Sequence, residues 1–139
     1  MSLKGDNRFL RGEDDDLVRI RVLLVEDHSD TRNVLELLLK RCGCQTVTAK
    51  NAKDARARLG DMDFDVLVSD LNLPDGDGID LVREAKGRHN LKAIAVTGRT
   101  SAEERERGLR AGFDVYLTKP IDFHELRCAI RVAEGPGKR

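Results

Sequence analysis

The sequence carries no excess charge of either sign. Its 25 lysine and arginine residues are balanced by 25 aspartate and glutamate residues, so the formal net charge is zero. Proteins that bind nucleic acid directly usually present a broad basic field. We therefore expect no direct contact between this chain and nucleic acid.

Long apolar runs are missing as well. No stretch approaches the roughly 18 consecutive apolar residues that a membrane-spanning helix needs. The first residues do not combine a charged start with an apolar segment, as a secretory signal would. These two absences argue against a membrane contact and against secretion. We expect a soluble protein located in the cytoplasm.

Cysteine is scarce, and its number is odd. Three cysteines, Cys42, Cys44 and Cys128, do not make a complete disulfide framework, and their number suits a reducing compartment. Cys42 and Cys44 flank a glycine, but no second ligand pair lies nearby in the sequence. We interpret the three as structural or incidental thiols, with redox sensing and metal binding as the alternatives.

The length of 139 residues suits one domain. Residues 1–18 are polar, include the acidic run Asp14, Asp15, Asp16 and show no sustained period, so we predict a flexible lead-in or an interdomain linker there. The folded domain is predicted at 19–134, and 135–139 should be a frayed tail. No internal repeat is present.

Short apolar runs alternate with helical patterns throughout the predicted domain. We predict strands at 22–26, 46–49, 66–69, 93–97 and 115–118, and helices that begin near Ser29, Asn51, Asp77, Ser101 and Asp122. Such alternation is typical of βα units around a parallel sheet. Three of the strands are nearly continuous in Val, Leu, Ile and Ala, as strands covered by helices on both faces should be. The prediction is an α/β fold of five βα units.

Polar residues follow four of the predicted strands. The first strand leads into Glu26 and Asp27, the third into Asp70, the fourth ends at Thr97 and the fifth leads into Lys119. Ligands of parallel α/β sheets bind at the carboxyl ends of the strands. Asp70 alone would pass for an ordinary turn residue, and Lys119 for its ion-pair partner. Together, the five residues predict a site.

Three crowded carboxylates repel one another unless a cation or protons neutralise them. An all-oxygen ligand set suits Mg²⁺, with Mn²⁺ as the alternative. Phosphoryl transfer needs a nucleophile, a cation and donors to the phosphoryl oxygens. We predict Asp70 as the nucleophile, Glu26 and Asp27 as metal ligands, and Thr97 and Lys119 as the donors.

The sequence resembles the response-regulator receiver family of two-component signalling, the CheY-like family, from Arg21 to Ala133. The resemblance rests on four motifs: Val-Leu-Leu-Val-Glu26-Asp27, Val-Ser-Asp70-Leu-Asn-Leu-Pro74-Asp-Gly-Asp-Gly78, Ala-Val-Thr97-Gly98 and Tyr116-Leu-Thr-Lys119-Pro120. It implies a doubly wound, flavodoxin-like three-layer sandwich with strand order 2-1-3-4-5, and a receiver domain at 19–134.

The resemblance also implies a function. Asp70 would take a phosphoryl group from a histidine kinase, a histidine phosphotransfer domain or a small donor, in a Mg²⁺-dependent reaction. The chain would not be an enzyme in the ordinary sense, because it would catalyse only its own phosphorylation and dephosphorylation. The backbone carbonyl of Asn72 would be a further metal ligand, and Asn72 and Arg99 stand at positions associated with the lifetime of the acyl phosphate.

Two conformational features follow from the same resemblance. Thr97 would move toward phosphorylated Asp70 while the ring of Tyr116 turns inward, which would reshape a face made by the fourth helix, fifth strand and fifth helix. That face would contact an output domain or a second copy; the other interpretation of Tyr116 is a space-filling aromatic. The bond between Lys119 and Pro120 would be cis. Gly108 lies within the fourth predicted helix and either loosens it or packs close to a neighbour.

Three other functions are compatible with parts of this sequence. A haloacid-dehalogenase-like phosphatase would want a second aspartate where Asn72 stands, and a cap. A flavodoxin-like electron carrier would want a loop of Ser, Thr and Gly after the first strand, where Glu26 and Asp27 stand. A phosphorylation-independent interaction module is the strongest rival, and it is disfavoured because the key side chains are present.

Overall fold

A computed structural model of the chain describes residues 17–98 and 100–134. Residues 1–16 of the predicted lead-in, Arg99 and the predicted tail at 135–139 lie outside the described residues. In the described part no helix is long and apolar enough to cross a membrane. The strands are β1 (Arg21–Val25), β2 (Gln45–Ala49), β3 (Val66–Ser69), β4 (Asn72–Leu73), β5 (Gly76–Asp77), β6 (Lys92–Thr97) and β7 (Val115–Thr118), and the helices are α2 (Ser29–Arg41), α3 (Ala52–Asp61), α4 (Gly78–Arg88), α5 (Ala102–Ala111) and α6 (Phe123–Glu134).

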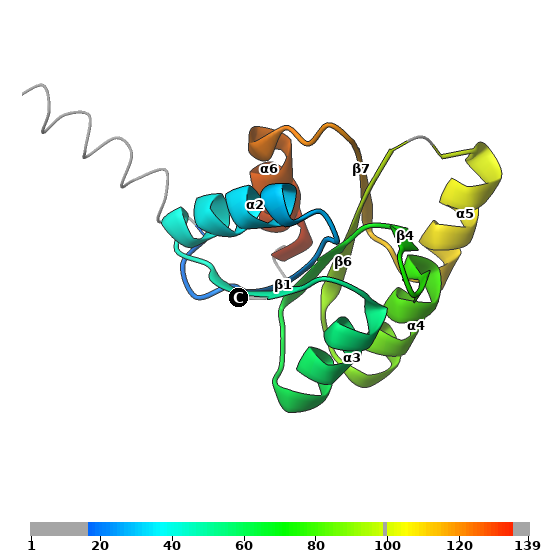
Figure 1. Cartoon of the computed structure of the whole chain (residues 1–139), viewed down its shortest axis with the longest axis horizontal. Coiled ribbons are helices and arrows are strands. Elements are labelled where there is room, and N and C mark those ends of the chain that lie inside the picture. The colour runs from blue at the N-terminus through cyan, green and yellow to red at the C-terminus, as the bar shows by residue number, and fades with distance from the viewer. Residues whose placement is uncertain (1–16, 99, 135–139) are drawn as a thin grey trace, which may run out of the picture.

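Five parallel strands form the central sheet, in the order β2-β1-β3-β6-β7. This is the predicted 2-1-3-4-5 order, and the doubly wound fold is confirmed. Helices α2 and α6 cover one face of the sheet, while α3, α4 and α5 lie on the other (Figure 1). Because Val25 pairs with Ser69 and Ser69 with Ala95, the ends of the three central strands lie at one edge of the sheet.

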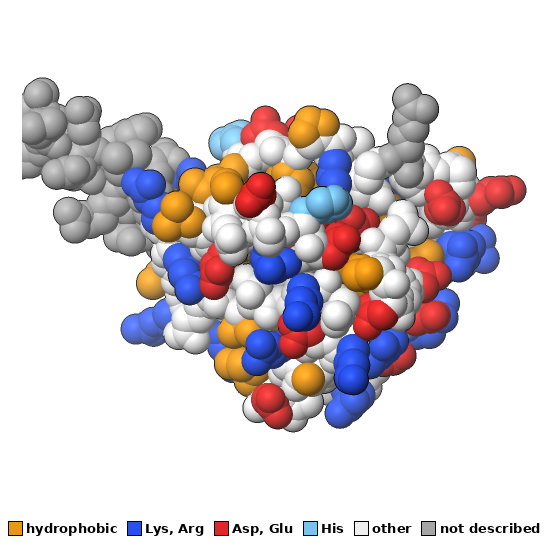
Figure 2. All heavy atoms as spheres, in the orientation of Figure 1, with side chains coloured by type: hydrophobic (Ala, Val, Ile, Leu, Met, Phe, Trp, Pro, Cys, Tyr) orange, Lys and Arg blue, Asp and Glu red, His pale blue; other side chains and the backbone are white. Residues whose placement is uncertain are grey.

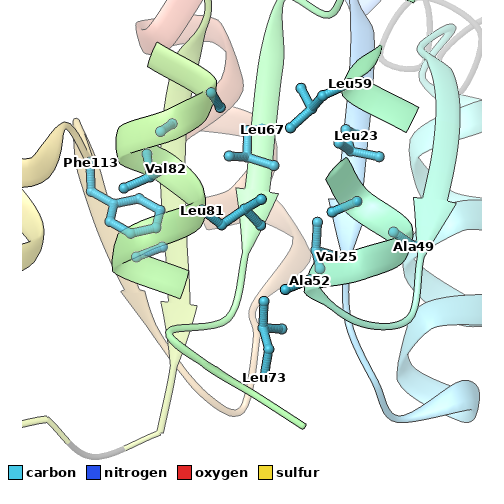
Figure 3. Packing of buried hydrophobic residues seen from close by; sticks show 14 of the residues in the cluster. Leu23, Val25, Ala49, Ala52, Leu59, Leu67, Leu73, Leu81, Val82 and Phe113 are labelled. Atoms are coloured by element: carbon cyan, nitrogen blue, oxygen red, sulfur yellow. The ribbon is translucent and has the colours of Figure 1, made fainter. Parts of the chain in front are cut away.

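Side chains of the central strands alternate between two apolar clusters, one on each face of the sheet. In β1, Leu23 and Val25 belong to the cluster under α3 and α4, whereas Val22 and Leu24 belong to the cluster under α2 and α6. Figure 3 shows the first of these clusters, with Leu67 of β3 between Leu81 of α4 and Leu23 of β1. All four β1 side chains are almost fully buried, and each such burial stabilises the fold by about 1.5–3 kcal/mol.

The helix starts follow the predicted capping residues with one exception. Asn51, Asp77 and Ser101 cap α3, α4 and α5, and the Ser101–Glu104 pair forms a full capping box. Asp122 accepts backbone N–H groups of His124 and Glu125 at the start of α6. The other helix, α2, differs from the prediction.

Ser29 does not cap α2, so that prediction is wrong. Ser29 is the first helical residue, and the N-cap position is taken by His28, whose side chain makes no capping hydrogen bond. The backbone N–H of His28 instead donates to Glu26 Oε2 at 3.0 Å. The Glu26 carboxylate therefore shapes the turn after β1. The N-cap of α2 lies one residue earlier than a serine cap would require.

The folded part begins before the predicted boundary at residue 19. Leu17 is fully buried among the residues under α2 and α6, and its N–H donates to Cys42 O at 3.3 Å. Gly43, at a φ of 96°, lies against Val18: a Cβ on Gly43 would be 3.0 Å from Val18 Cα. Leu17 and Val18 therefore close the end of α2 and belong to the domain rather than to the lead-in.

A short antiparallel hairpin, β4–β5, follows β3 and was not predicted. Asn72 pairs with Asp77 and Leu73 with Gly76. Between these strands, the Asp75 carboxylate accepts the backbone N–H groups of Ala52 and Lys53 at 2.7 and 3.0 Å. Hydrogen bonds from Lys53 and Ala52 lower the pKa of Asp75. The segment after Asp70 is thereby tied to the start of α3.

Candidate functional site

Lys119 joins two of the predicted acids at the carboxyl edge of the sheet. Its Nζ lies 2.8 Å from Asp70 Oδ2 and 3.1 Å from Glu26 Oε1. The three residues follow β7, β3 and β1, so the strand order creates the contact. The backbone N–H of Lys119 also donates to Thr97 O at 2.8 Å, which ties β7 to the end of β6. The bond from Lys119 to Pro120 is cis, as the resemblance implied.

Lys119 is held as a cation by its neighbours. Burial is the largest single influence on its pKa and lowers it, but hydrogen bonds and charge from Asp70 and Glu26 together outweigh burial and raise the pKa. The ammonium group therefore stays protonated at neutral pH. It offers hydrogen-bond donors at the oxygens of Asp70.

Asp70 is held on both carboxylate oxygens. Oδ2 accepts from Lys119, and Oδ1 accepts the backbone N–H of Asn72 at 3.1 Å. The residue is 8% exposed, so most of Asp70 is enclosed by the protein. Its own backbone carbonyl accepts the hydroxyl of Ser69 at 2.8 Å.

Gly78 supports Asp70 from the start of α4. Its N–H donates to Leu71 O at 2.7 Å. A Cβ on Gly78 would overlap the backbone oxygen of Asp70 and lie 2.9 Å from Leu71 Cα. Since backbone atoms cannot give way as a flexible side chain can, only glycine fits here. In the sequence, this glycine stands out only as part of the motif after Asp70.

Glu26, Asp27 and His28 form the acidic side of the site. Their ligand atoms lie within 4.8 Å of one another. Glu26 is 2% exposed, whereas the side chain of Asp27 is 35% exposed and that of His28 is open to solvent. His28 Nδ1 is 3.1 Å from Glu26 Oε2 and 3.5 Å from Asp27 Oδ1. His28 was not predicted as part of the site, although its position directly after the acidic pair was a signal.

The donor set fits a hard divalent cation. Glu26, Asp27 and Asp70 carry three formal negative charges, and Lys119 carries one positive charge, which leaves a formal excess of two. Carboxylate and carbonyl oxygens are the ligands that Mg²⁺ prefers. The backbone N–H of Asn72 donates to Asp70 Oδ1 at 3.1 Å, so Asn72 lies directly beside the predicted nucleophile.

Thr97 is buried at the end of β6 with an unused hydroxyl. It is 2% exposed, and within the described part of the chain its Oγ1 is the one buried side-chain polar atom that lacks a hydrogen-bond partner. A buried hydroxyl without a partner costs about 1–3 kcal/mol. Because β6 pairs with β3, this unpaired hydroxyl lies at the same end of the sheet as Asp70.

Thr97→Val should therefore stabilise the unmodified chain by about 1 kcal/mol, because valine keeps the shape and removes the unsatisfied hydroxyl. Urea denaturation of both proteins measures this difference in the free energy of unfolding. A loss of stability would mean that the hydroxyl is hydrogen-bonded in solution, through water or a rotated side chain.

Tyr116 packs against α5 from the middle of β7. Its ring meets Phe113 edge-on at 5.9 Å, Arg105 lies 5.2 Å from the ring centroid, and its hydroxyl is 3.5 Å from Glu104 O. A Cβ on Gly108 would overlap the Tyr116 hydroxyl. Gly108 therefore packs close to a neighbour, as one of the two interpretations held. Burial raises the pKa of Tyr116.

The surface of the described part of the chain carries positive and negative side chains side by side. On the face drawn in Figure 2, lysine and arginine side chains are interspersed with aspartate and glutamate, and no broad area has one sign. This distribution agrees with the zero net charge of the sequence.

Comparisons with known proteins agree on one family. The family described as the response regulator receiver domain matches residues 22–131. The response regulator protein PilR of Pseudomonas aeruginosa is 38% identical over 116 residues, which cover 83% of this chain and 26% of PilR. An uncharacterized 14.6 kDa protein of Leptolyngbya boryana is 41% identical over 113 residues, 79% of this chain and 86% of that protein.

A solved structure agrees with the sequence relatives. The non-phosphorylated HemR receiver domain of Leptospira biflexa has a TM-score of 0.78 at 29% identity, and the match covers 84% of this chain and 95% of that one. The chain thus spans nearly all of some relatives, but only 26% of PilR and 46% of the aerobic respiration control protein ArcA of Escherichia coli.

Proposed function

The chain belongs to the response regulator receiver domains of two-component systems, and on that premise we propose that Asp70 accepts a phosphoryl group. The observation that carries the proposal is the contact of Asp70 Oδ2 with Lys119 Nζ at 2.8 Å, beside the buried Glu26. The Asp70 carboxylate thereby lies next to a fixed cation, the Lys119 ammonium group. That is the arrangement that phosphoryl transfer needs.

In the proposed reaction, a carboxylate oxygen of Asp70 attacks the phosphorus atom of a phosphohistidine. The new O–P bond forms as the P–N bond breaks, and the imidazole leaves with the electron pair of that bond and then takes up a proton. Lys119, already protonated, donates to the phosphoryl oxygens as charge builds on them. With acetyl phosphate as donor, acetate is the leaving group instead.

Glu26, Asp27, Asp70 and the carbonyl of Asn72 are the proposed ligands of Mg²⁺, with Mn²⁺ as the alternative. The formal excess of two negative charges supports a divalent cation there. When bound, the cation would neutralise charge on the phosphoryl oxygens. The chain's own residues would hold the nucleophile in place and donate to those oxygens.

Magnesium should raise the thermal stability of the chain, because binding to the folded state alone shifts the unfolding equilibrium. At ten times the dissociation constant, the expected gain is about 1.4 kcal/mol. Thermal melts in MgCl₂ and in NaCl of equal ionic strength separate specific binding from screening. A midpoint that rises equally in both salts would contradict a specific site.

Thr97 and Tyr116 are the proposed switch residues. The unused buried hydroxyl of Thr97 supports its role as a donor to a phosphoryl group on Asp70. Movement of Thr97 would accompany an inward turn of the Tyr116 ring, away from its present contacts with Glu104 and Arg105. These contacts lie on α5, so the face of α5, β7 and α6 would change shape.

The proposed partners follow from this chemistry. A histidine kinase or a histidine phosphotransfer domain would supply the phosphoryl group, and an output domain or a second copy would contact the face of α5, β7 and α6. The chain would catalyse only its own phosphorylation and dephosphorylation. A cytoplasmic location and the absence of direct contact with nucleic acid or membrane remain predictions of the sequence.

A further inference from the structure

A thiol and an imidazole lie together on α6, away from the site of Asp70. His124 and Cys128 are four residues apart in this helix, so both point from the same face. The distance from Cys128 Sγ to His124 Nε2 is 3.7 Å. His124 is exposed, and Cys128 is partly exposed and is a free thiol. The phosphorylation site uses neither residue.

The pair lines a hollow beside β7, the edge strand of the sheet. Val115 and Leu117 of β7 form one wall, and His124, Glu125 and Cys128 of α6 form the other. The hollow has a volume of about 360 Å³. An ion from solvent can therefore reach the nitrogen and the sulfur, unlike the buried Cys42 and Cys44 in the core.

The separation of the two donor atoms matches one edge of a zinc coordination tetrahedron. Zinc binds thiolate sulfur at about 2.3 Å and imidazole nitrogen at about 2.0–2.1 Å, which at the tetrahedral angle places the two donors about 3.6 Å apart. The observed 3.7 Å is close to that value without any rearrangement of the helix. We propose that His124 and Cys128 form a two-ligand binding site for a borderline-soft divalent cation, Zn²⁺.

This site would differ in chemistry from the proposed magnesium site at Glu26, Asp27 and Asp70. Nitrogen and sulfur donors select zinc-like cations, whereas carboxylate oxygens select Mg²⁺. The Cys128 thiol loses its proton to solvent when it binds the metal as thiolate. One chain fills two of the four tetrahedral positions, and water or the same pair from a second copy would fill the other two. The proposal does not depend on phosphorylation of Asp70.

Cobalt(II) is the probe, because a Co²⁺–thiolate bond gives an intense near-ultraviolet charge-transfer band that oxygen ligands do not give. The reduced full chain is titrated with Co²⁺ in the presence of excess Mg²⁺. The Mg²⁺ would occupy the proposed magnesium site, so that Co²⁺ does not bind there. The expected result is a band that Zn²⁺ abolishes by displacement. Cys128→Ser should eliminate the band, and His124→Asn should shift its appearance to higher Co²⁺ concentration.

The matched control is His89→Asn, which changes a histidine at the end of α4, outside both sites, and should leave the band unchanged. A band that persists in Cys128→Ser would assign the thiolate to Cys42 or Cys44 and overturn the proposal, as would the absence of a band in the unaltered chain. Alkylation of the unaltered chain gives a test without variants: Zn²⁺ should protect Cys128 from iodoacetamide, measured by peptide mass spectrometry. Equal alkylation with and without Zn²⁺ would also overturn the proposal.

Discussion

Asp70→Asn should abolish phosphorylation of this chain by acetyl phosphate and Mg²⁺. The unaltered chain is expected to gain one phosphoryl group, detected by intact-protein mass spectrometry. Asparagine keeps the size of the side chain but replaces the nucleophilic carboxylate oxygen with a neutral amide. It also weakens the contact with Lys119, now 2.8 Å from Asp70 Oδ2. No phosphorylated species is expected in the variant.

Asp80→Asn is the matched control for this experiment. Asp80 lies on α4 with an exposed side chain that pairs with Arg83, and the same change of charge there should leave labelling intact. Labelling that persists in Asp70→Asn would place the phosphoryl group on another residue. If the unaltered chain itself stays unlabelled while Mg²⁺ still binds, the phosphorylation-independent interaction module becomes the better interpretation.

Gly78→Ala should destabilise the chain by about 3 kcal/mol, a large overpacking cost. The added Cβ would overlap the backbone oxygen of Asp70 and crowd Leu71 Cα at 2.9 Å, so either α4 or the segment that carries Asp70 must move. Because that segment sets the position of Asp70, the proposed nucleophile, phosphorylation by acetyl phosphate should also slow. Urea denaturation measures the first effect, and the initial labelling rate under folding conditions measures the second.

Gly87→Ala provides the control within the same helix. A Cβ on Gly87 meets nothing within 4 Å, so the substitution should stabilise the chain by about 0.5 kcal/mol through the lower entropy of the unfolded state. Opposite signs at the two ends of α4 are the expected pattern. Equal effects of the two substitutions would mean that the backbone at Gly78 relaxes freely, and that the close approach to Asp70 has no energetic role.

Local patterns predicted the fold because they depend on neighbours in sequence. The apolar runs of β1, β3 and β6 and the capping residues Asn51, Asp77 and Ser101 act over a few residues, and each of these elements formed where expected. Ser29 failed as a cap for a reason that is also local. The Glu26 carboxylate accepts the N–H of His28 and shapes the turn first. Residue type alone did not show whether Ser29 or His28 would take the N-cap position of α2.

Long-range packing explains the other features of the structure that the sequence did not predict. Leu17 directly follows the acidic run Asp14, Asp15, Asp16, which favours a lead-in, yet it packs against residues under α2 and α6. The close approach of Gly78 to Asp70 and of Gly108 to Tyr116 likewise depends on how two elements meet. A period in the sequence shows which face of an element is buried, but not which atoms of another element lie opposite.

By itself, the sequence determined the order of the βα units and the identity of the residues at the strand ends, because apolar periodicity and residue type are local properties. Only the tertiary structure decided which side chains meet. It set Lys119 between Asp70 and Glu26, left the Thr97 hydroxyl buried without a partner, and brought His124 to 3.7 Å from Cys128. These distances depend on how strands pair and how side chains pack, which no local pattern specifies.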